Sequence, residues 1–222
     1  MLRLELQRPR LPQSGVVDPD DVRYGVFLTP DVRTSAAVTA VTGFIRAQFG
    51  LVSAGAFPPH VTLAGSLPLR VDEDELVATV AAVVRRRPSF EVQNNGIALL
   101  GDSVVYDVHD PDGAPNARLI ALVEDLVPAV FPLLGPSTGL APDLRGRDVW
   151  RGHLSLASHE LLGQAELRAE VEAFVRQLDV PYPSRFAATT VTVYRFSSAG
   201  WAGPWWTPLR WERVTSLGLP DS

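Results

Sequence analysis

Two short segments of this chain repeat one pattern of residue types. Residues 60–63 read His-Val-Thr-Leu and residues 153–156 read His-Leu-Ser-Leu, so the second segment begins 93 positions after the first. Side chains alternate between the two faces of a β-strand, and residues i and i+2 therefore point the same way. Each segment is thus predicted to be a strand that presents an imidazole and a hydroxyl on one face and two aliphatic side chains to a core.

The repetition is more informative than either copy alone. With average residue usage, a histidine is followed by aliphatic, Ser or Thr, aliphatic about 1% of the time. Here two of the four histidines are followed in this way. Two such strands brought together would form one site with two imidazoles and two hydroxyls; the plainer alternative is a pair of half-buried strands whose histidines are structural.

The residue types that are missing exclude several kinds of chemistry. The chain of 222 residues has no cysteine and no lysine, so all 20 basic side chains other than histidine are arginine. Disulfides, thiolate nucleophiles and cysteine metal sites are excluded, as are a lysine–nucleotidyl intermediate, a Schiff base and a Walker-type phosphate lysine. The net charge of −5 does not fit a protein that coats long nucleic acid. A nucleotide or an oligonucleotide end is the ligand that we expect instead, with no long duplex.

The same composition bears on location and assembly. The longest largely apolar run, residues 76–84, is too short to span a bilayer, and the charged N-terminus has no stretch typical of a secretory signal. We therefore expect a cytoplasmic monomer that does not contact membranes.

Hydrophobic periodicity predicts an α+β fold built from two similar halves. Each half is expected to run helix, motif strand, helix, two strands. The predicted domains are an N-terminal arm (1–21), a first lobe (22–101) and a second lobe (102–222). The elements predicted from the pattern are helices at 34–49 (capped by Thr34 or Ser35), 72–87, 117–131 and 161–178, and strands at 24–28, 90–99, 104–108, 189–196 and 210–217.

These features resemble the 2H phosphoesterase superfamily, and within it the bacterial 2′-5′ RNA ligase and cyclic phosphodiesterase branch. The resemblance rests on the paired His-x-Thr/Ser-x segments, on the Pro-Pro that precedes His60, and on the two-fold repeat over residues 23–196. Two departures concern the second segment. Ser155 stands where threonine is common, and Arg151-Gly152 stands where proline often precedes the histidine.

The resemblance implies two pseudo-symmetric lobes, each an antiparallel sheet with flanking helices, around a central cleft. It also implies hydrolysis of 2′,3′-cyclic phosphates without metal or cofactor, and in some members ATP-independent 2′-5′ joining. General chemistry agrees, because in-line displacement at phosphorus needs one group to accept a proton and another to donate one. The predicted catalytic residues are His60 and His153 for proton transfer, and Thr62 and Ser155 as hydrogen-bond donors to the phosphate.

Three further side chains are predicted to bind the substrate: Arg151, on the face of His153, and the pair Tyr194 and Arg195. The alternative for that pair is a solvent-facing position on a sheet edge. Other candidates are interpreted as not catalytic: His109 as structural or exposed, His159 as part of a helix start, Arg145 and Arg147 as solvated loop residues, and the tryptophans at 201–211 as packing or an oligomer contact rather than a base-stacking surface.

The sequence leaves the function open among three hypotheses. The leading one is a metal-independent phosphoesterase that opens 2′,3′-cyclic phosphate ends of RNA or nucleotides. The second keeps the site but changes the substrate to a 2′-5′-linked or cyclic oligonucleotide or an ADP-ribose cyclic phosphate, with reverse 2′-5′ ligation. The third is a non-catalytic module that binds a phosphorylated end, although arginine would serve binding alone better than paired histidines do.

Overall fold

The computed structural model describes residues 22–110, 112–137, 139–146 and 149–221. The predicted arm, residues 1–21, and Arg147 lie outside this part of the chain. The described residues form four α-helices and nine β-strands with two 3-10 turns: β1 (Val22–Thr29), α1 (Val32–Phe49), β2 (Val61–Leu67), α2 (Glu73–Val84), β3 (Phe90–Gln93), β4 (Ile97–Leu100), β5 (Ser103–Asp107), α3 (Ala117–Val130), η2 (Phe131–Leu133), β6 (His153–Ala157), η3 (His159–Leu161), α4 (Ala165–Gln177), β7 (Arg185–Ala188), β8 (Thr190–Ser197) and β9 (Arg210–Gly218).

The strands make three antiparallel sheets. A four-stranded sheet has the order β2-β1-β8-β9, a three-stranded sheet has the order β4-β5-β6, and β3 pairs with β7 between them. The motif strands β2 and β6 are edge strands of the two larger sheets. This mixture of helices and antiparallel strands confirms the predicted α+β class.

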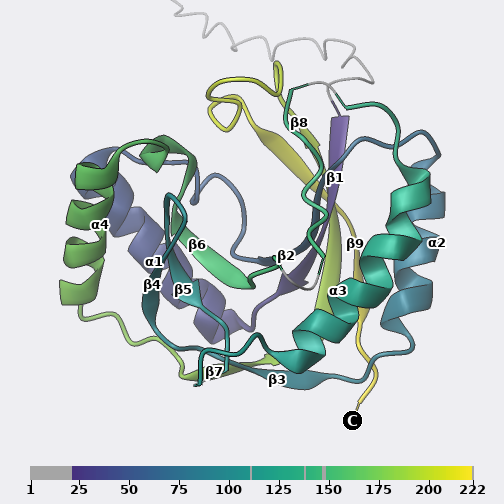
Figure 1. The fold of residues 1–222 in the computed structure, drawn as a ribbon, viewed down its shortest axis with the longest axis horizontal. Helices are drawn as coiled ribbons and strands as arrows, with labels where there is room; N and C mark the ends of the chain where they lie inside the picture. The colour runs from purple at the N-terminus through teal and green to yellow at the C-terminus, as the bar shows by residue number, and fades with distance from the viewer. Residues whose placement is uncertain (1–21, 111, 138, 147–148, 222) are drawn as a thin grey trace, which may run out of the picture.

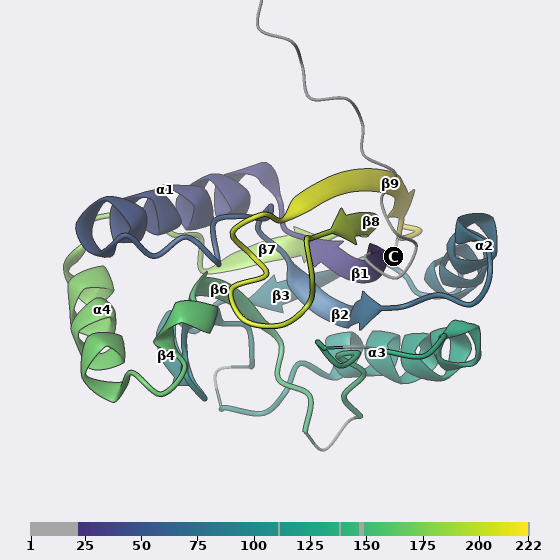
Figure 2. The same cartoon turned by 90° about the horizontal axis from the view of Figure 1, so that it is seen from above.

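Helices cover one face of each larger sheet, as Figures 1 and 2 show from two directions. Helices α2 and α3 pack together, with α3 against β2 and α2 against β9. Helices α1 and α4 pack together on the other sheet, with α1 against β6 and α4 against β4 and β5. Each helix therefore buries its apolar side against a strand that is distant in the sequence.

The order of helices and strands occurs twice along the chain, and elements of each copy pack with elements of the other copy. The series β1-α1-β2-α2-β3-β4 matches β5-α3-β6-α4-β7-β8, and β9 is an added edge strand. Helix α1 follows β1 but packs on the sheet of β5, whereas α3 follows β5 but packs on the sheet of β1. Strands β8 and β4 are exchanged in the same way.

This exchange bears on the predicted lobes. The expected boundary between residues 101 and 102 falls in the turn between β4 and β5, so each side carries one copy of the series. All three sheets, however, contain strands from both sides of that boundary. The ranges 22–101 and 102–222 therefore each carry one copy of the element series, and the two copies share every described sheet.

Several predicted boundaries need correction. Helix α1 begins at Val32, because Asp31 is its N-cap and its carboxylate accepts a hydrogen bond from the N–H of Thr34 at 2.8 Å. The single strand predicted at 90–99 is two strands, since Gly96 has φ +85° and its N–H bonds to the side chain of Asn94. Strand β7 was not predicted, and η3 precedes α4, which starts at Ala165 rather than at 161.

Among the residues described, none of the helices is long and apolar enough to cross a membrane.

Candidate functional site

The two motif segments have the predicted alternation of buried and accessible side chains. Val61, Leu63, Leu154 and Leu156 are buried in the main core. The histidine and the hydroxyl residue of each segment (His60, Thr62, His153 and Ser155) are only partly buried. The imidazole and hydroxyl of each segment therefore share the face of the strand that points away from the core.

Both imidazoles are held in the same way. Nδ1 of His60 lies 2.7 Å from the carbonyl oxygen of Pro58, and Nδ1 of His153 lies 2.9 Å from the carbonyl oxygen of Arg151. A carbonyl oxygen only accepts hydrogen bonds, so Nδ1 carries the proton in each ring. The neutral ring then has its free lone pair on Nε2, which is the atom available for proton transfer.

Contacts between the two repeats bring the motif strands together. Strands β2 and β6 contact each other. The indole N–H of Trp150, three residues before His153, donates a hydrogen bond of 3.1 Å to the carbonyl oxygen of Thr62. Gly65 of β2 and Asp143 exchange two backbone hydrogen bonds of 2.8 and 2.9 Å. The loop that precedes the second motif is thus joined directly to the strand of the first.

The surroundings of the two histidines favour the neutral rings. Burial, together with repulsion from a charged His153, lowers the pKa of His60 to about 4, although the hydrogen bond to Pro58 opposes the shift. Burial also lowers the pKa of His153, with smaller contributions in the same direction from Arg145 and His109, while the Arg151 carbonyl and Asp143 oppose it.

Aromatic rings surround the His60 imidazole. Phe27 and Phe57 each contact it edge to face, with ring centroids 4.6 Å away. Phe27 lies directly opposite Thr62 in the pairing of β1 with β2. These rings limit the access of water to His60, and this explains why burial is the main cause of its lowered pKa.

The three predicted substrate-binding residues lie in different places. Arg151 is exposed beside the second motif, and its guanidinium donates to the carbonyl of Trp150 at 2.9 Å. Tyr194 is buried against the rings of Phe57, Phe27 and Trp211. Tyr194 therefore packs against the same two phenylalanine rings that contact His60.

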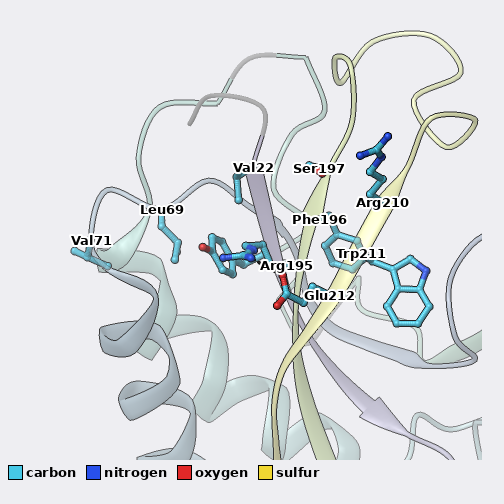
Figure 3. A pocket seen from close by; sticks show the side chains of 10 residues that line it. Val22, Leu69, Val71, Arg195, Phe196, Ser197, Arg210, Trp211 and Glu212 are labelled. Carbon is cyan, nitrogen blue, oxygen red and sulfur yellow. Dashed lines mark hydrogen bonds and ion pairs between the residues drawn. The ribbon is translucent and has the colours of Figure 1, made fainter. Parts of the chain in front are cut away.

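Arg195 lies on the opposite face of β8 from Tyr194. It forms ion pairs with Glu212 and, at 3.7 Å, with Glu73. It lines a cavity of about 600 Å³ beside Tyr24 and Val22, shown in Figure 3. None of the four motif residues lines this cavity, and a role of Arg195 in substrate binding stays a prediction.

The remaining candidates take structural positions. His109 is hydrogen-bonded to Asp107, which lies directly opposite His153 on β5. His159 begins η3 and stacks on Trp206 with the centroids 5.2 Å apart. Trp201 packs in the aromatic cluster that contains Phe27 and Tyr194. In residues 22–221, apart from the gaps named above, no group of three or more His, Asp or Glu side chains is placed to hold a metal ion.

Sequence reasoning missed the residues that connect the two motifs. Trp150 and Glu160 each contact the opposite motif or the loop before it, and Phe57 contacts the imidazole of its own motif. Trp150 and Phe57 lie within three residues of a motif histidine, and such proximity was the one available signal. Nothing in the sequence indicates which partner each would contact.

Comparison with known proteins settles the family. A family model described as the 2′-5′ RNA ligase superfamily matches residues 30–200. The chain belongs to the 2′-5′ RNA ligase superfamily. The resemblance to 2H phosphoesterases is thereby confirmed at the level of the family. No curated protein sequence matches this superfamily member.

Several solved structures are similar to this chain at low identity, and one of them, with a TM-score above 0.5, shows the same fold. The protein TT0787 of Thermus thermophilus is 13% identical, with a TM-score of 0.55 over 90% of this chain and 99% of that one. E. coli LigT complexed with ATP is 16% identical, with a TM-score of 0.49 over 90% and 98%. Kluyveromyces marxianus Usb1 is 13% identical, with a TM-score of 0.44 over 90% and 98%.

Gly152, which replaces the proline expected before the second histidine, is required by close packing. A Cβ at this position would lie 2.6 Å from the indole ring of Trp150 and 2.9 Å from Cγ2 of Val108. We predict that Gly152→Ala lowers the free energy of unfolding by about 1–3 kcal/mol, measured by urea denaturation. Gly43→Ala is the control: Gly43 lies within α1 with open space around it and should gain about 0.5–1 kcal/mol. A Gly152→Ala protein as stable as wild type would contradict the packing argument.

Proposed function

We propose that this superfamily member opens 2′,3′-cyclic phosphate ends of RNA or nucleotides, with His60 and His153 as the proton-transfer groups. The observation that carries the proposal is the matched hydrogen bonding of the two imidazoles. Each Nδ1 is bonded to the carbonyl oxygen two residues before it, which leaves both Nε2 atoms for substrate. Two rings held in the same tautomer on contacting strands suit a reaction that removes one proton and delivers another.

The proposed reaction proceeds by in-line displacement at phosphorus. One neutral imidazole accepts a proton from the attacking water, and the other, protonated, donates a proton to the leaving sugar oxygen. One P–O bond forms and one breaks, so a single phosphomonoester results. The hydroxyls of Thr62 and Ser155 donate hydrogen bonds to the non-bridging oxygens, where negative charge accumulates.

The negative charge of the bound substrate favours protonation of one of the two imidazoles. In the free protein the lowered pKa values favour two neutral rings at neutral pH. A bound phosphodiester is an anion, and an opposite charge nearby raises the pKa of an imidazole. Binding would therefore promote protonation of the ring that acts as the acid. Since the two imidazoles supply both proton transfers, the proposal needs no metal ion.

The absence of lysine limits the joining reactions that this chain could catalyse. A joining reaction through a lysine–nucleotide intermediate is excluded by the sequence. Any 2′-5′ joining would have to reverse the opening of a cyclic phosphate, and water at its ordinary concentration favours hydrolysis. We therefore propose hydrolysis as the direction of the reaction.

The direct test is turnover of nucleoside 2′,3′-cyclic phosphates in the presence of EDTA. Loss of a general acid or base costs about 10²- to 10⁴-fold in rate. We expect that fall in kcat/KM for His60→Ala and for His153→Ala, and a double variant little worse than either because the two groups act as a unit.

The control for that test is His159→Ala, which removes a histidine outside the motifs and should keep activity within a few-fold of wild type. Loss of wild-type turnover in EDTA, or full activity in either motif variant, would contradict the proposal. A panel that includes 2′-5′-linked dinucleotides and an ADP-ribose cyclic phosphate, with products identified by phosphorus NMR, separates the substrate classes.

The lowered pKa values also predict an acid-shifted pH optimum. The value of kcat/KM reports the free enzyme and requires one neutral and one protonated imidazole. It therefore falls at low pH, where both rings are protonated, and falls again at higher pH, where both are neutral. Both limits lie below about 6.5, because the pKa of His60 is lowered to about 4 and the pKa of His153 is lowered from its ordinary value of 6.5. The optimum is expected between these limits, whichever ring is the base.

Circular dichroism at each pH is the control for this profile. A group whose folded pKa lies below its unfolded value stabilises the fold above the unfolded pKa, and that stability is lost as pH falls through the folded value. Folding should therefore weaken from about pH 6.5 down towards 4. An optimum well above pH 7 would contradict the proposed pair of imidazoles with lowered pKa values.

A further inference from the structure

A single carboxylate holds the loop that leads into His60. One oxygen of Glu160 accepts hydrogen bonds from the backbone N–H groups of Val52 and Ser53, both at 2.7 Å. The Ser53 hydroxyl donates to the other oxygen. Glu160 itself lies in η3, three residues after the end of β6. The carboxylate therefore joins the loop of the first motif to the end of the strand that carries His153.

A second side chain strengthens the same junction. The hydroxyl of Ser53, which is buried, lies 3.1 Å from the hydroxyl of Ser158, the residue just before η3. The two loops that flank the motifs thus meet at Ser53. This junction is separate from the hydrogen bond between Trp150 and Thr62. The junction at Ser53 joins residues before His60 to residues after His153. The bond from Trp150 joins a residue before His153 to one after His60.

The carboxylate is suited to a permanent structural bond. Burial by itself raises the pKa of Glu160, but the hydrogen bonds from Ser53 and from the two backbone N–H groups outweigh it and hold the pKa below its usual value. These hydrogen bonds therefore favour the ionised form of Glu160. Hydrogen bonds to an ionised acceptor are shorter and stronger than neutral ones.

The loop carries this restraint to the imidazole. Four residues beyond Ser53, Phe57 contacts the ring of His60. The carbonyl of Ala56 accepts a hydrogen bond of 3.1 Å from the indole of Trp211, so the loop is fixed at both ends. Removal of the Glu160 carboxylate would free the end nearest the second repeat while leaving the Trp211 bond in place.

We infer that Glu160 is a positioning residue that sets the distance between the two imidazoles. The inference rests on the proposed function, since that distance matters for catalysis only if both rings act on one phosphate. A displacement of about 1 Å in a catalytic group can cost about 100-fold in rate. The effect should appear mainly in kcat, because the residues that would contact the substrate remain.

The experiment compares Glu160→Ala, Glu160→Gln and Glu166→Ala on a nucleoside 2′,3′-cyclic phosphate. Glu160→Ala should lower kcat by about 10- to 100-fold with KM changed far less. Glu160→Gln should recover most of the activity, because its amide oxygen still accepts the two backbone N–H groups. Glu166 is exposed on α4, and Glu166→Ala should match wild type.

Two readouts do not depend on turnover. Amide hydrogen exchange at Val52 and Ser53 should accelerate in Glu160→Ala and stay slow in Glu166→Ala. The pKa of His60, followed by NMR, should rise from about 4 towards 6.5 in Glu160→Ala, because the ring moves away from His153 and gains water. If wild type turns over no cyclic phosphate, the proposed function fails, and these two readouts still decide whether Glu160 sets the geometry.

The inference is overturned by any of three results: unchanged exchange at Val52 and Ser53, an unchanged His60 pKa, or unchanged kcat in a Glu160→Ala protein whose loop has been freed. If Glu160→Ala does not fold, Ser53→Ala takes its place. That variant keeps both backbone hydrogen bonds and removes the hydroxyl bonds to Glu160 and Ser158, so it should show a smaller loss of kcat in the same direction. Wild-type kcat in Ser53→Ala, with an unchanged His60 pKa, would equally overturn the inference.

Discussion

The site depends on one interaction that occurs twice: an imidazole Nδ1–H bonded to the carbonyl oxygen two residues before it, at Pro58 and at Arg151. These bonds fix the tautomer and the orientation of both rings without help from a carboxylate. Because each donor lies two residues after its acceptor, the orientation of each imidazole is set locally, and it is the same at both motifs. The rest of the fold must place the two motif segments, each with its hydrogen-bonded imidazole, relative to each other.

That placement comes from the exchange of elements between the repeats. Helix α1 covers the sheet of the second motif and α3 covers the sheet of the first, so neither repeat can bury its own apolar faces alone. The bond from Trp150 to Thr62 and the pairing of Gly65 with Asp143 then set the register of one motif against the other. In this arrangement each motif is anchored to residues of the other repeat.

Local features of the site could be predicted from the sequence, and contacts between distant segments could not. Alternation alone predicted that Val61 and Leu154 are buried while His60 and His153 share a face with their hydroxyl partners. The same reasoning could not find the bonds of Glu160 to Val52 and Ser53, since they join residues more than 100 positions apart and involve backbone groups that any residue provides. Gly152 is a similar case. The sequence showed a departure from the family pattern, and only the position of the Trp150 ring explains why a side chain cannot fit there.

The most direct measurement of the central claim is NMR of the imidazole nitrogens of His60 and His153 in the free protein and during titration with a nucleoside 2′-monophosphate. We expect both rings to carry their proton on Nδ1 when free, and both to respond to the ligand with one common affinity as one of them becomes protonated. A ring protonated on Nε2 in the free protein, or two rings that respond with different affinities, would contradict it.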